Sequence, residues 1–466
     1  MTNFPATLFA GQRFAVVGLG RNGLPAAQAL ASMGAAVVAW DDNPKAREAA
    51  QADASRFGYE VRDPNGDTFP FDALVLSPGI PHIRPRVHPI AARALAAGVP
   101  ILTDAELLYR AVRAAGSRAR FVGVTGTNGK STTTALLAHI LEIAGVPVAA
   151  GANLGPAALS LPLLADNGVY VLEMSSYMLE RLATIRFHAA VMLNLSPDHI
   201  ERHGDMDFYV RAKSAIFARQ TDADLAVIGV DDHWGGEALR LSGSPARVVR
   251  VSGGPEADVC YRDGAVCDAA GPILAMNEAP TLPGAHNAQN AAAASSMALF
   301  LGVSRADIAA GLRTYPGLPH RQQLITTIDG IAFINDSKAT NADSTAWALG
   351  CHDRIIWIAG GMAKEGGIEA LVPYFPRLVQ TFLIGQDAPI LAATLAAHGI
   401  AHETVGTLEA AVPAALAAAR ANGMPTGAPV VLLSPACASF DQFSGFDARG
   451  DRFADLARAL AGTGGA

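Results

Sequence analysis

The sequence predicts an α/β protein of three domains whose sheets are mainly parallel. The first observation is a repeated alternation of strand-length apolar runs, glycine-bearing loops and alanine-rich runs of helical composition. The second is the length, since 466 residues exceed one ordinary core and predict two or three domains. The third is the composition, because 50% hydrophobic and 17% charged residues are typical of a compact globular protein with large buried sheets.

Charge and cysteine content exclude several classes of protein. A net charge of −7 argues against nucleic acid as a partner, because binding a phosphate backbone requires a basic surface. The N-terminal residues lack a basic segment followed by a long apolar one, and the apolar runs are too short to span a membrane. The four cysteines show no metal-ligand spacing and predict reduced thiols. We therefore expect a cytoplasmic protein without membrane or nucleic-acid partners. We also expect a monomer, although charge and cysteine content do not determine the oligomeric state.

The first domain, predicted for residues 1–110, opens with a strand, a glycine turn, a helix and a second strand in "RFAVVGLGRNGLPAAQALASMGAAVVAWDD". The turn spells G-x-G-x-x-G at Gly18, Gly20 and Gly23. Asp41 and Asp42 follow the second strand, at about the distance at which an acid binds a ribose. The pattern favours a nucleotide-type ligand, with NAD as the default, over a turn that serves packing alone.

The second domain, predicted for residues 111–317, begins with the strand, loop and helix of "RFVGVTGTNGKSTT". A phosphate loop usually has glycine or alanine five positions before Gly129, where this chain has Val124. The other parts are present: flexible amides, a lysine for the β- and γ-phosphates and a hydroxyl for Mg²⁺. We therefore predict an ATP site at Gly126, Thr127, Asn128, Gly129, Lys130, Ser131 and Thr132.

Further polar residues of this domain follow strand-like runs. "VYVLEMSS" places Glu173 at a strand end, and "VMLNLSPDH" places Asp198 and His199 at another. Such ends gather around the ligand crevice of a parallel sheet, where a carboxylate can hold Mg²⁺. Tyr209 and Lys213 lie four residues apart on one helix face, and spacing alone predicts that Lys213 is a surface lysine.

The third domain, predicted for residues 318–466, carries lysines and hydroxyls after its strands. "INDSKATN" places Asp336, Lys338 and Thr340 at a strand end, which fits either a site or a capped turn. Lys364 in "GGMAKEGG" and Ser439 in "LLSPACASFDQF" occupy similar places. Such groups suit a small carboxylated substrate, because each donates hydrogen bonds to anionic oxygen. The sequence shows no Ser/His/Asp or Cys/His pattern that indicates covalent catalysis.

These segments together resemble the Mur ligase family. The resemblance is carried, in family order, by "GVTGTNGKSTT", "EMSSYMLE", "NLSPDHIERHG", "GAHNAQN", "GLPHR" and "NDSKATN", which span nearly the whole chain. The ending "LLSPACASFDQFSGFDARGDRF" is similar to that of the members that join D-glutamate to UDP-N-acetylmuramoyl-L-alanine. The resemblance implies Rossmann-like N- and C-terminal domains, for the UDP-sugar and the amino acid, around a central ATPase domain with a P-loop. It also places the protein in peptidoglycan precursor synthesis.

The resemblance also implies the roles of individual residues. In place of NAD, the first domain would bind the UDP-sugar through Gly18, Gly20, Arg21, Asn22, Gly23, Asp41, Asp42, Ser77, Pro78 and Gly79. Adenine and ribose would be surrounded by Asn287, Asn290, Arg321 and Asp336. D-glutamate would be framed by Lys338, Thr340, Lys364, Ser439 and Phe446. Two magnesium ions would be held with the help of Ser131, Glu173, His199 and a carbamylated Lys213. Catalytic roles would belong to Lys130, Asn153, His199 and Lys213.

The implied reaction is ATP-driven amide formation. The γ-phosphoryl group is transferred to a carboxylate, and the acyl phosphate is then attacked by the amine of D-glutamate. Closure of the domains is expected to assemble the site. Alternatives are another Mur-type or folylpolyglutamate-like ligase, an NAD-dependent oxidoreductase that uses the first glycine turn, and a non-catalytic ATP switch.

Overall fold

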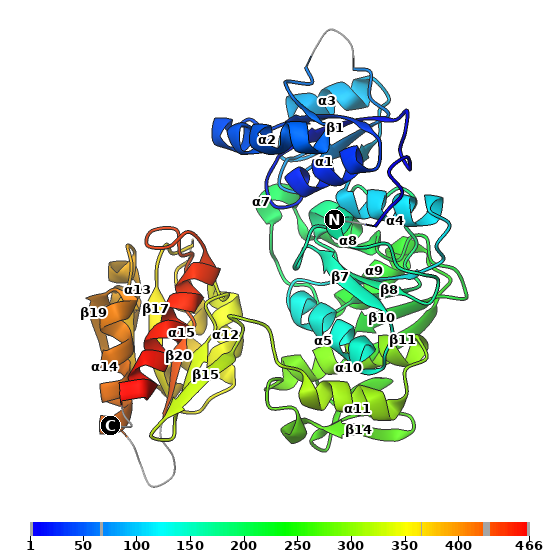
Figure 1. Ribbon diagram of the computed structural model, residues 1–466. Helices are drawn as coiled ribbons and strands as arrows, with labels where there is room; N and C mark the ends of the chain where they lie inside the picture. The colour runs from blue at the N-terminus through cyan, green and yellow to red at the C-terminus, as the bar shows by residue number, and fades with distance from the viewer. Residues whose placement is uncertain (1–2, 66–68, 365, 423–428, 464–466) are drawn as a thin grey trace. The chain divides into compact units, whose positions relative to one another are not determined.

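The computed structural model describes residues 3–65, 69–364, 366–422 and 429–463. The chain divides into two compact units. The first consists of Met1–Ala279 and Asn287–Tyr315, and the second of Pro280–His286 and Pro316–Ala466. Three mainly parallel sheets with flanking helices confirm the predicted α/β class (Figure 1). The predicted domain boundaries at residues 110 and 317 stay a prediction.

The first sheet has the strand order β3-β2-β1-β4-β5, and all its pairs are parallel. Its strands are β1 (Arg13–Val17), β2 (Ala36–Trp40), β3 (Glu60–Val61), β4 (Ala73–Leu76) and β5 (Ile101–Leu102). Its helices are α1 (Gly23–Ser32), α2 (Pro44–Phe57), α3 (Pro89–Ala96) and α4 (Asp104–Ala114). Because β1 pairs with β2 on one side and β4 on the other, the order reverses where the glycine turn follows β1. Parallel sheets bind ligands at such a point.

The packing of the glycine turn predicts that two of its glycines differ in how well they tolerate a side chain. A Cβ added at Gly23 would lie 1.8 Å from the carbonyl oxygen of Gly18, whereas one added at Gly20 would meet nothing within 4 Å. We expect Gly23→Ala to lower the free energy of unfolding by about 2 kcal/mol or more, because backbone must move. Gly20→Ala is the matched control and should leave it nearly unchanged. Denaturant titration of both variants measures the difference, and equal stabilities would contradict the packing described.

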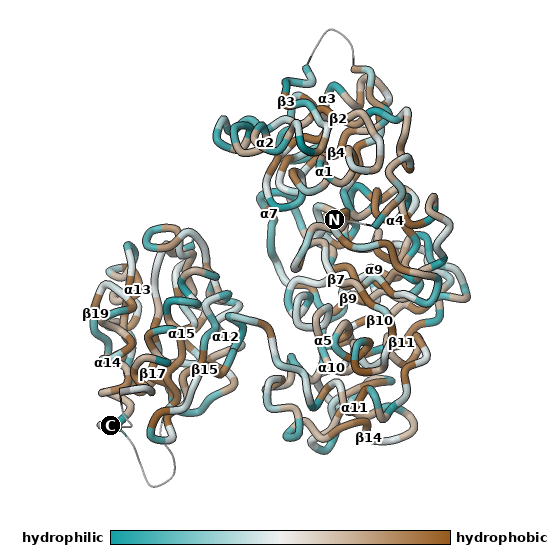
Figure 2. The backbone as a smooth tube through the Cα atoms, in the orientation of Figure 1, coloured by the Kyte–Doolittle hydropathy of each residue, from teal (hydrophilic) through white to brown (hydrophobic). Residues whose placement is uncertain are grey.

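The second sheet, with nine strands, has the order β14-β13-β12-β11-β10-β9-β6-β8-β7. Its parallel part is β6 (Arg120–Thr125), β7 (Val148–Ala152), β8 (Val169–Glu173), β9 (Ala189–Met192), β10 (Leu225–Gly229) and β11 (Arg247–Ser252). The remaining strands at this edge of the sheet are β12 (Val259–Arg262), β13 (Ala265–Asp268) and β14 (Gly271–Ala275). The β12–β13 and β13–β14 pairs are antiparallel. Central strands β9 and β10 are buried throughout and coloured as hydrophobic in Figure 2.

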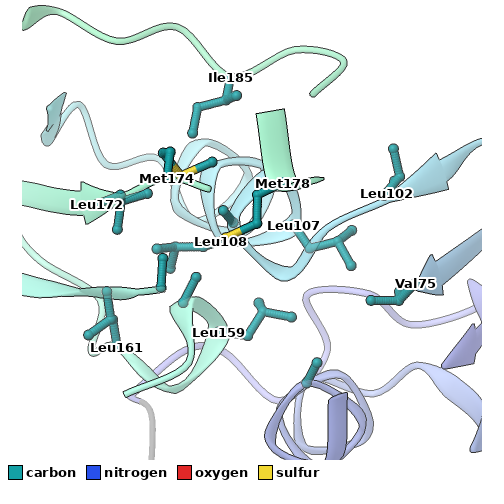
Figure 3. Packing of buried hydrophobic residues seen from close by; sticks show 14 of the residues in the cluster. Val75, Leu102, Leu107, Leu108, Leu159, Leu161, Leu172, Met174, Met178 and Ile185 are labelled. Atoms are coloured by element: carbon teal, nitrogen blue, oxygen red, sulfur yellow. The ribbon is translucent and has the colours of Figure 1, made fainter. Parts of the chain in front are cut away.

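Helices of the second sheet carry or support the candidate site residues. They are α5 (Lys130–Ile143), α6 (Ser176–Leu179), α7 (Ile200–His203), α8 (Met206–Ser214), α9 (Trp234–Ser242), α10 (Ala285–Phe300) and α11 (Arg305–Thr314), with short 3₁₀ turns η1 (Ala158–Ser160) and η2 (Met276–Glu278). One apolar cluster joins both sheets of the first unit (Figure 3). It runs from Val75 and Leu102 through Leu108 of α4 to Leu172 and Met178. This shared core explains why both sheets lie in one compact unit.

The second unit contains a sheet of order β15-β16-β20-β17-β18-β19. Its strands are β15 (Gln323–Ile328), β16 (Ile331–Asn335), β17 (Ile355–Gly360), β18 (Leu378–Ile384), β19 (His402–Gly406) and β20 (Val430–Leu433). Only the β15–β16 pair among them is antiparallel. The helices are α12 (Ala342–Gly350), η3 (Glu369–Arg377), α13 (Ala388–Ala397), α14 (Leu408–Ala421) and α15 (Phe446–Thr463). One of the alanine-rich runs of predicted helical composition is α14, whose apolar face lies in the core.

Over the described parts of the chain, no helix has the length and apolar character needed to cross a bilayer.

Candidate functional site

The predicted phosphate loop joins β6 to the N-terminus of α5. Gly129 has a φ of +82° at the N-cap, and an added Cβ would lie 2.3 Å from Oδ1 of Asn290. The loop is held from the far side by Asn194, whose carbonyl accepts from Thr127 N at 2.8 Å and whose Oδ1 accepts from Asn128 N at 2.9 Å. The backbone therefore has one fixed shape, with a helix N-terminus at its end, as anion binding requires.

Lys130 is the first residue of α5 and lies over the loop. Its Nζ donates to the carbonyl oxygens of Gly126 at 2.9 Å and of Thr127 at 2.7 Å. The ammonium is thus held against the loop where the β- and γ-phosphates of a nucleotide are expected. Ser131 and Thr132 follow on the first turn of the helix, and Ser131 is buried.

Lys213 is buried, so its interpretation from spacing as a surface lysine is wrong. Its side chain on α8 is 2% exposed, and its Nζ donates to Gly126 O at 2.8 Å and to Thr125 Oγ1 at 3.2 Å. Burial and the nearby charge of Lys130 hold the pKa of the Lys213 amine well below its ordinary value. A buried amine that is neutral is a nucleophile, whereas an ammonium is not.

Glu173 ends β8, as predicted from the sequence, and its carboxylate is incompletely bonded. Its Oε1 accepts from Asn153 Nδ2 at 2.5 Å. Its Oε2 is buried and has no hydrogen-bond partner among the described residues. A buried oxygen without a partner is costly, so this atom fits a cation that would be supplied with the nucleotide. In the described segments, no three His, Cys, Asp or Glu side chains group closely enough to hold a metal by themselves.

A magnesium ion does not require such a group. Mg²⁺ is usually held by one or two carboxylates together with waters and substrate phosphates. The partnerless oxygen of Glu173 therefore fits the ion, with Ser131 and Lys213 on neighbouring elements.

His199 lies farther from its strand than the sequence predicts. Strand β9 ends at Met192, and His199 follows six residues of loop, as the N-cap of α7 with a φ of +56°. Its ring lies 3.4 Å from Asp198 and 3.7 Å from Glu201, and burial lowers the pKa of the imidazole. A neutral ring in a left-handed backbone conformation is compatible with a role as ligand or as base.

Asn287 and Asn290 lie on α10, beside the end of the phosphate loop. Asn290 Oδ1 accepts from Thr133 Oγ1 at 3.1 Å, and its Nδ2 donates to Asn287 Oδ1 at 3.1 Å. Both amides are buried. The structure thus brings these two predicted ATP residues together with Gly129, while Arg321 and Asp336 belong to the other unit.

The predicted UDP-sugar residues cluster around the glycine turn. Asp41 Oδ2 accepts from Leu19 N at 2.6 Å, so its carboxylate fixes the turn itself. Ser77 Oγ donates to Gly18 O at 2.6 Å and ties the loop after β4 to the same turn. Asp42 accepts from Trp40 and pairs with His88 at 3.1 Å, while Gly79 is exposed at the tip of its loop.

Arg21 and Asn22 reach the second sheet. Arg21 donates to the carbonyl oxygens of Asn153 at 3.1 Å and of Gly155 at 2.6 Å. Asn22 Nδ2 donates to the buried carboxylate of Asp104 at 3.1 Å and to the carbonyl oxygen of Ala152, the last residue of β7, at 3.5 Å. These side chains therefore support the position of Asn153, which in turn binds Glu173.

In the second unit, the strand end after β16 has a buried carboxyl group. Asp336 follows Asn335, the last residue of β16, and its oxygens accept from Ser434 Oγ at 2.7 Å and Gln322 N at 3.2 Å. Burial raises the pKa of Asp336 from 3.8 to about 7, although these hydrogen bonds oppose the shift. The group therefore keeps its proton to a much higher pH than an exposed aspartate does.

This carboxyl group predicts an unusual pH dependence of stability. Its pKa is 3.8 when exposed and about 7 in the folded protein, so the folded state binds the extra proton between these values. Its contribution to the free energy of unfolding therefore falls as pH rises through that window. We expect Asp336→Asn to remove this loss, measured by denaturant titration at pH about 5 and about 7.5. The same change in the free energy of unfolding between these two pH values in variant and wild type would contradict the raised pKa of Asp336.

The residues predicted for D-glutamate also lie in the second unit, four of them in loops that follow strands and Phe446 at the start of α15. Lys338 places its Nζ 3.7 Å from the ring centroid of Phe446, a cation–π contact, so the structure brings these two together. Ser439 is buried, Thr340 is half-buried and Lys364 is exposed. Arg321, which was predicted for ATP, is half-buried.

Two buried arginines were missed by the sequence analysis. Arg449 is 1% exposed and donates to Ser337 Oγ at 3.0 Å and to Cys437 O at 3.1 Å, which joins two strand-end loops of the second unit. Arg181 is 3% exposed and binds backbone carbonyls of the loop after β4. Sequence patterns predict that charged residues are exposed. The only signal for the two arginines was their position in the segments "LERL" and "FDARG".

Comparison with known proteins places this geometry in one family. The model of the Mur ligase middle domain matches residues 124–298. A UDP-N-acetylmuramoylalanine–D-glutamate ligase of Paramagnetospirillum magneticum is 47% identical over 459 residues, covering 97% of this chain and 98% of that protein. One of the same name from Rhodospirillum rubrum is 46% identical over 470 residues, covering 98% and 97%.

Solved structures agree in fold. The UDP-N-acetylmuramate–alanine ligase of Thermotoga maritima has a TM-score of 0.59 at 18% identity, over 96% of this chain and 99% of that one. MurF of Acinetobacter baumannii has a TM-score of 0.59 at 19% identity, over 96% and 93%. At these identities the likeness concerns the fold, and the full-length relatives decide the family. The chain belongs to the Mur ligase family, whose members are ATP-dependent ligases.

Proposed function

We propose that this protein joins D-glutamate to UDP-N-acetylmuramoyl-L-alanine with hydrolysis of ATP to ADP and phosphate. The observation that carries the proposal is identity of 47% over 97% of the chain with a relative named for that reaction. The likeness extends over both units, so it includes the regions assigned to the two substrates and to ATP. We assign UDP-sugar binding to residues 1–110, ATP binding to residues 111–317 and amino-acid binding to residues 318–466.

The first step of the proposed reaction forms an acyl phosphate. The carboxylate of the L-alanyl group attacks the γ-phosphorus of ATP, and ADP leaves. The backbone amides of the phosphate loop and the ammonium of Lys130 balance the negative charge that develops on the transferred group. The geometry that supports this role is the contact of Lys130 Nζ with two loop carbonyls, which holds the charge at the loop.

Metal ligands are proposed among the residues that converge on Gly126 and Glu173. Glu173 offers a buried oxygen without a partner, and Ser131 is the first hydroxyl of α5. When bound, magnesium neutralises phosphate charge and orients the γ-phosphoryl group. Lys213 in its neutral form would add to CO₂ and release a proton. The resulting carbamate would supply oxygen ligands, and His199 would supply a ring nitrogen near a second ion.

The second step attaches the amino acid. The neutral amine of D-glutamate attacks the acyl phosphate, and the tetrahedral intermediate expels phosphate. We propose that D-glutamate and the reacting groups are framed by Lys338, Thr340, Lys364, Ser439 and Phe446. The ammonium of Lys338 already lies over the ring of Phe446. His199 is the candidate for accepting the proton of the amine, since its pKa is lowered by burial.

Isotope transfer tests the proposed chemistry. With ¹⁸O in the L-alanyl carboxylate, one ¹⁸O atom should appear in the phosphate released in each turnover, because the acyl phosphate carries that oxygen to the leaving group. Unlabelled phosphate with formation of the product would contradict the acyl-phosphate route. Mass spectrometry should show a UDP-sugar product heavier by one glutamyl residue.

We also propose that the protein acts as a monomer in the cytoplasm, without membrane or nucleic-acid partners. Light scattering at assay concentration tests the first point, and a dimer mass would contradict it.

A further inference from the structure

Arg181 lies just after α6, a helix of the second sheet, and binds the loop that follows β4 of the first sheet. Its Nη1 donates to the carbonyl oxygens of Leu76 at 2.6 Å and Ser77 at 3.0 Å, and its Nη2 donates to that of Ile80. Its Nε donates to His82 Nδ1 at 3.1 Å. All its donor groups therefore face one loop, which includes Ser77, Pro78 and Gly79.

We propose that Arg181 is a positioning residue that sets the shape of the UDP-sugar loop and ties it to the strand end carrying Glu173. The inference rests on the proposed function, because it takes residues 77–79 as part of the UDP-sugar site.

The loop needs an external donor because of its own sequence. Ser77 and Ile80 each precede a proline, and proline has no backbone N–H. The loop therefore has two fewer backbone donors for its own carbonyl groups. Within the loop, one turn bond is present, from Ile80 N to Ser77 O at 3.0 Å. A guanidinium with five fixed donors can satisfy several carbonyls at once. It also keeps these negative oxygens turned toward itself and away from an anionic diphosphate on the exposed side.

The residues around Arg181 leave a positive charge in the interior. Arg181 and Arg202 are both buried, and Glu180 lies 3.5 Å from Arg202 Nη2. Burial and the charge of Arg181 lower the pKa of His82 to about 4, so this ring is neutral at neutral pH. With two arginines and one glutamate, the buried group has an excess positive charge behind the loop. Such a field favours a bound diphosphate.

The same segment reaches the ATP side of the sheet. Arg181 follows Glu173 by eight residues, through α6, and Thr125 Oγ1 at the end of β6 donates to Met174 O at 2.8 Å. His203 of α7 contacts both Ser176 Oγ at 2.9 Å and Glu180 Oε1 at 3.1 Å. The loop that would hold the UDP-sugar is thus bonded to the element next to the candidate metal ligand. This connection would keep the donor carboxylate in register with the γ-phosphate.

Steady-state kinetics of Arg181→Lys test the inference. Lysine keeps the charge but cannot reach all the carbonyls, so we expect the KM for UDP-N-acetylmuramoyl-L-alanine to rise by about tenfold to a hundredfold. The KM values for ATP and D-glutamate should change by about twofold or less, and kcat should fall less than that KM rises.

The matched control is Arg219→Lys. Arg219 also binds backbone carbonyls, those of Leu182 at 2.7 Å and Ala183 at 2.8 Å, but these belong to the segment after Arg181 and not to the loop. It should leave all three KM values near those of the wild type. An unchanged KM for the UDP-sugar in Arg181→Lys, or equal rises of all three KM values, would overturn the inference. A wild-type protein without turnover on this substrate would instead overturn the proposed function.

Hydrogen–deuterium exchange on the wild-type protein gives a test that does not depend on a variant folding. Adding UDP-N-acetylmuramoyl-L-alanine without ATP should slow exchange in residues 176–185 as well as in the loop after β4. Protection of the loop without protection of residues 176–185 would overturn the coupling.

Discussion

Lys130→Ala should abolish turnover while leaving the protein folded. The side chain contacts two carbonyls of its own loop, at 2.9 and 2.7 Å, so its removal opens little space and breaks no core packing. The loss of one cation aimed at a transferring phosphoryl group costs about a thousandfold in kcat. Phosphate release under saturating substrates measures the effect.

The control for this variant is Lys45→Ala, which removes an exposed lysine from the start of α2. It should have wild-type kcat. A Lys130→Ala protein that retains more than about a tenth of wild-type kcat would show that this ammonium does not carry the charge of the transferred group.

Lys213→Ala should lose most of its activity and regain part of it with added formate or acetate. A buried amine with a lowered pKa can add to CO₂, and a carbamate is a carboxylate-like ligand on a lysine stem. Removing the side chain leaves a space into which a short carboxylate can enter and supply the same oxygens. We expect kcat of Lys213→Ala to fall by about a hundredfold or more, because the variant lacks a charged metal ligand.

The control separates rescue from a general effect of carboxylates. Lys130→Ala, treated in the same way, should gain nothing, since its lost group is a cation. Wild-type activity should also fall when CO₂ is removed from the buffer and recover when bicarbonate is added. Normal turnover in Lys213→Ala would show that activity does not require a carbamate on Lys213.

The sequence predicted those parts of the site that depend on local patterns. A glycine loop between a strand and a helix, and an acid at the end of a buried strand, are set by neighbours in the chain. Gly129 and Glu173 therefore lie where their motifs indicated, with Glu173 as the last residue of β8. The α/β class followed from the same alternation of strands, loops and helices.

The parts that the sequence did not predict depend on contacts between distant segments. Lys213 is buried because α8 packs its inner face against β6 and the phosphate loop, a contact across about ninety residues. Arg181 reaches a loop that lies about a hundred residues earlier. Helical spacing places Lys213 on a face but does not say what covers that face. The shared core of the first two sheets is likewise a matter of tertiary packing.

The amino-acid dependence of phosphate release decides whether this protein is a D-glutamate-adding ligase. With UDP-N-acetylmuramoyl-L-alanine, ATP and Mg²⁺ present, we expect steady phosphate release with D-glutamate and little with L-glutamate, L-alanine or L-lysine. Release that is the same with and without D-glutamate, or fastest with another amino acid, would contradict this expectation.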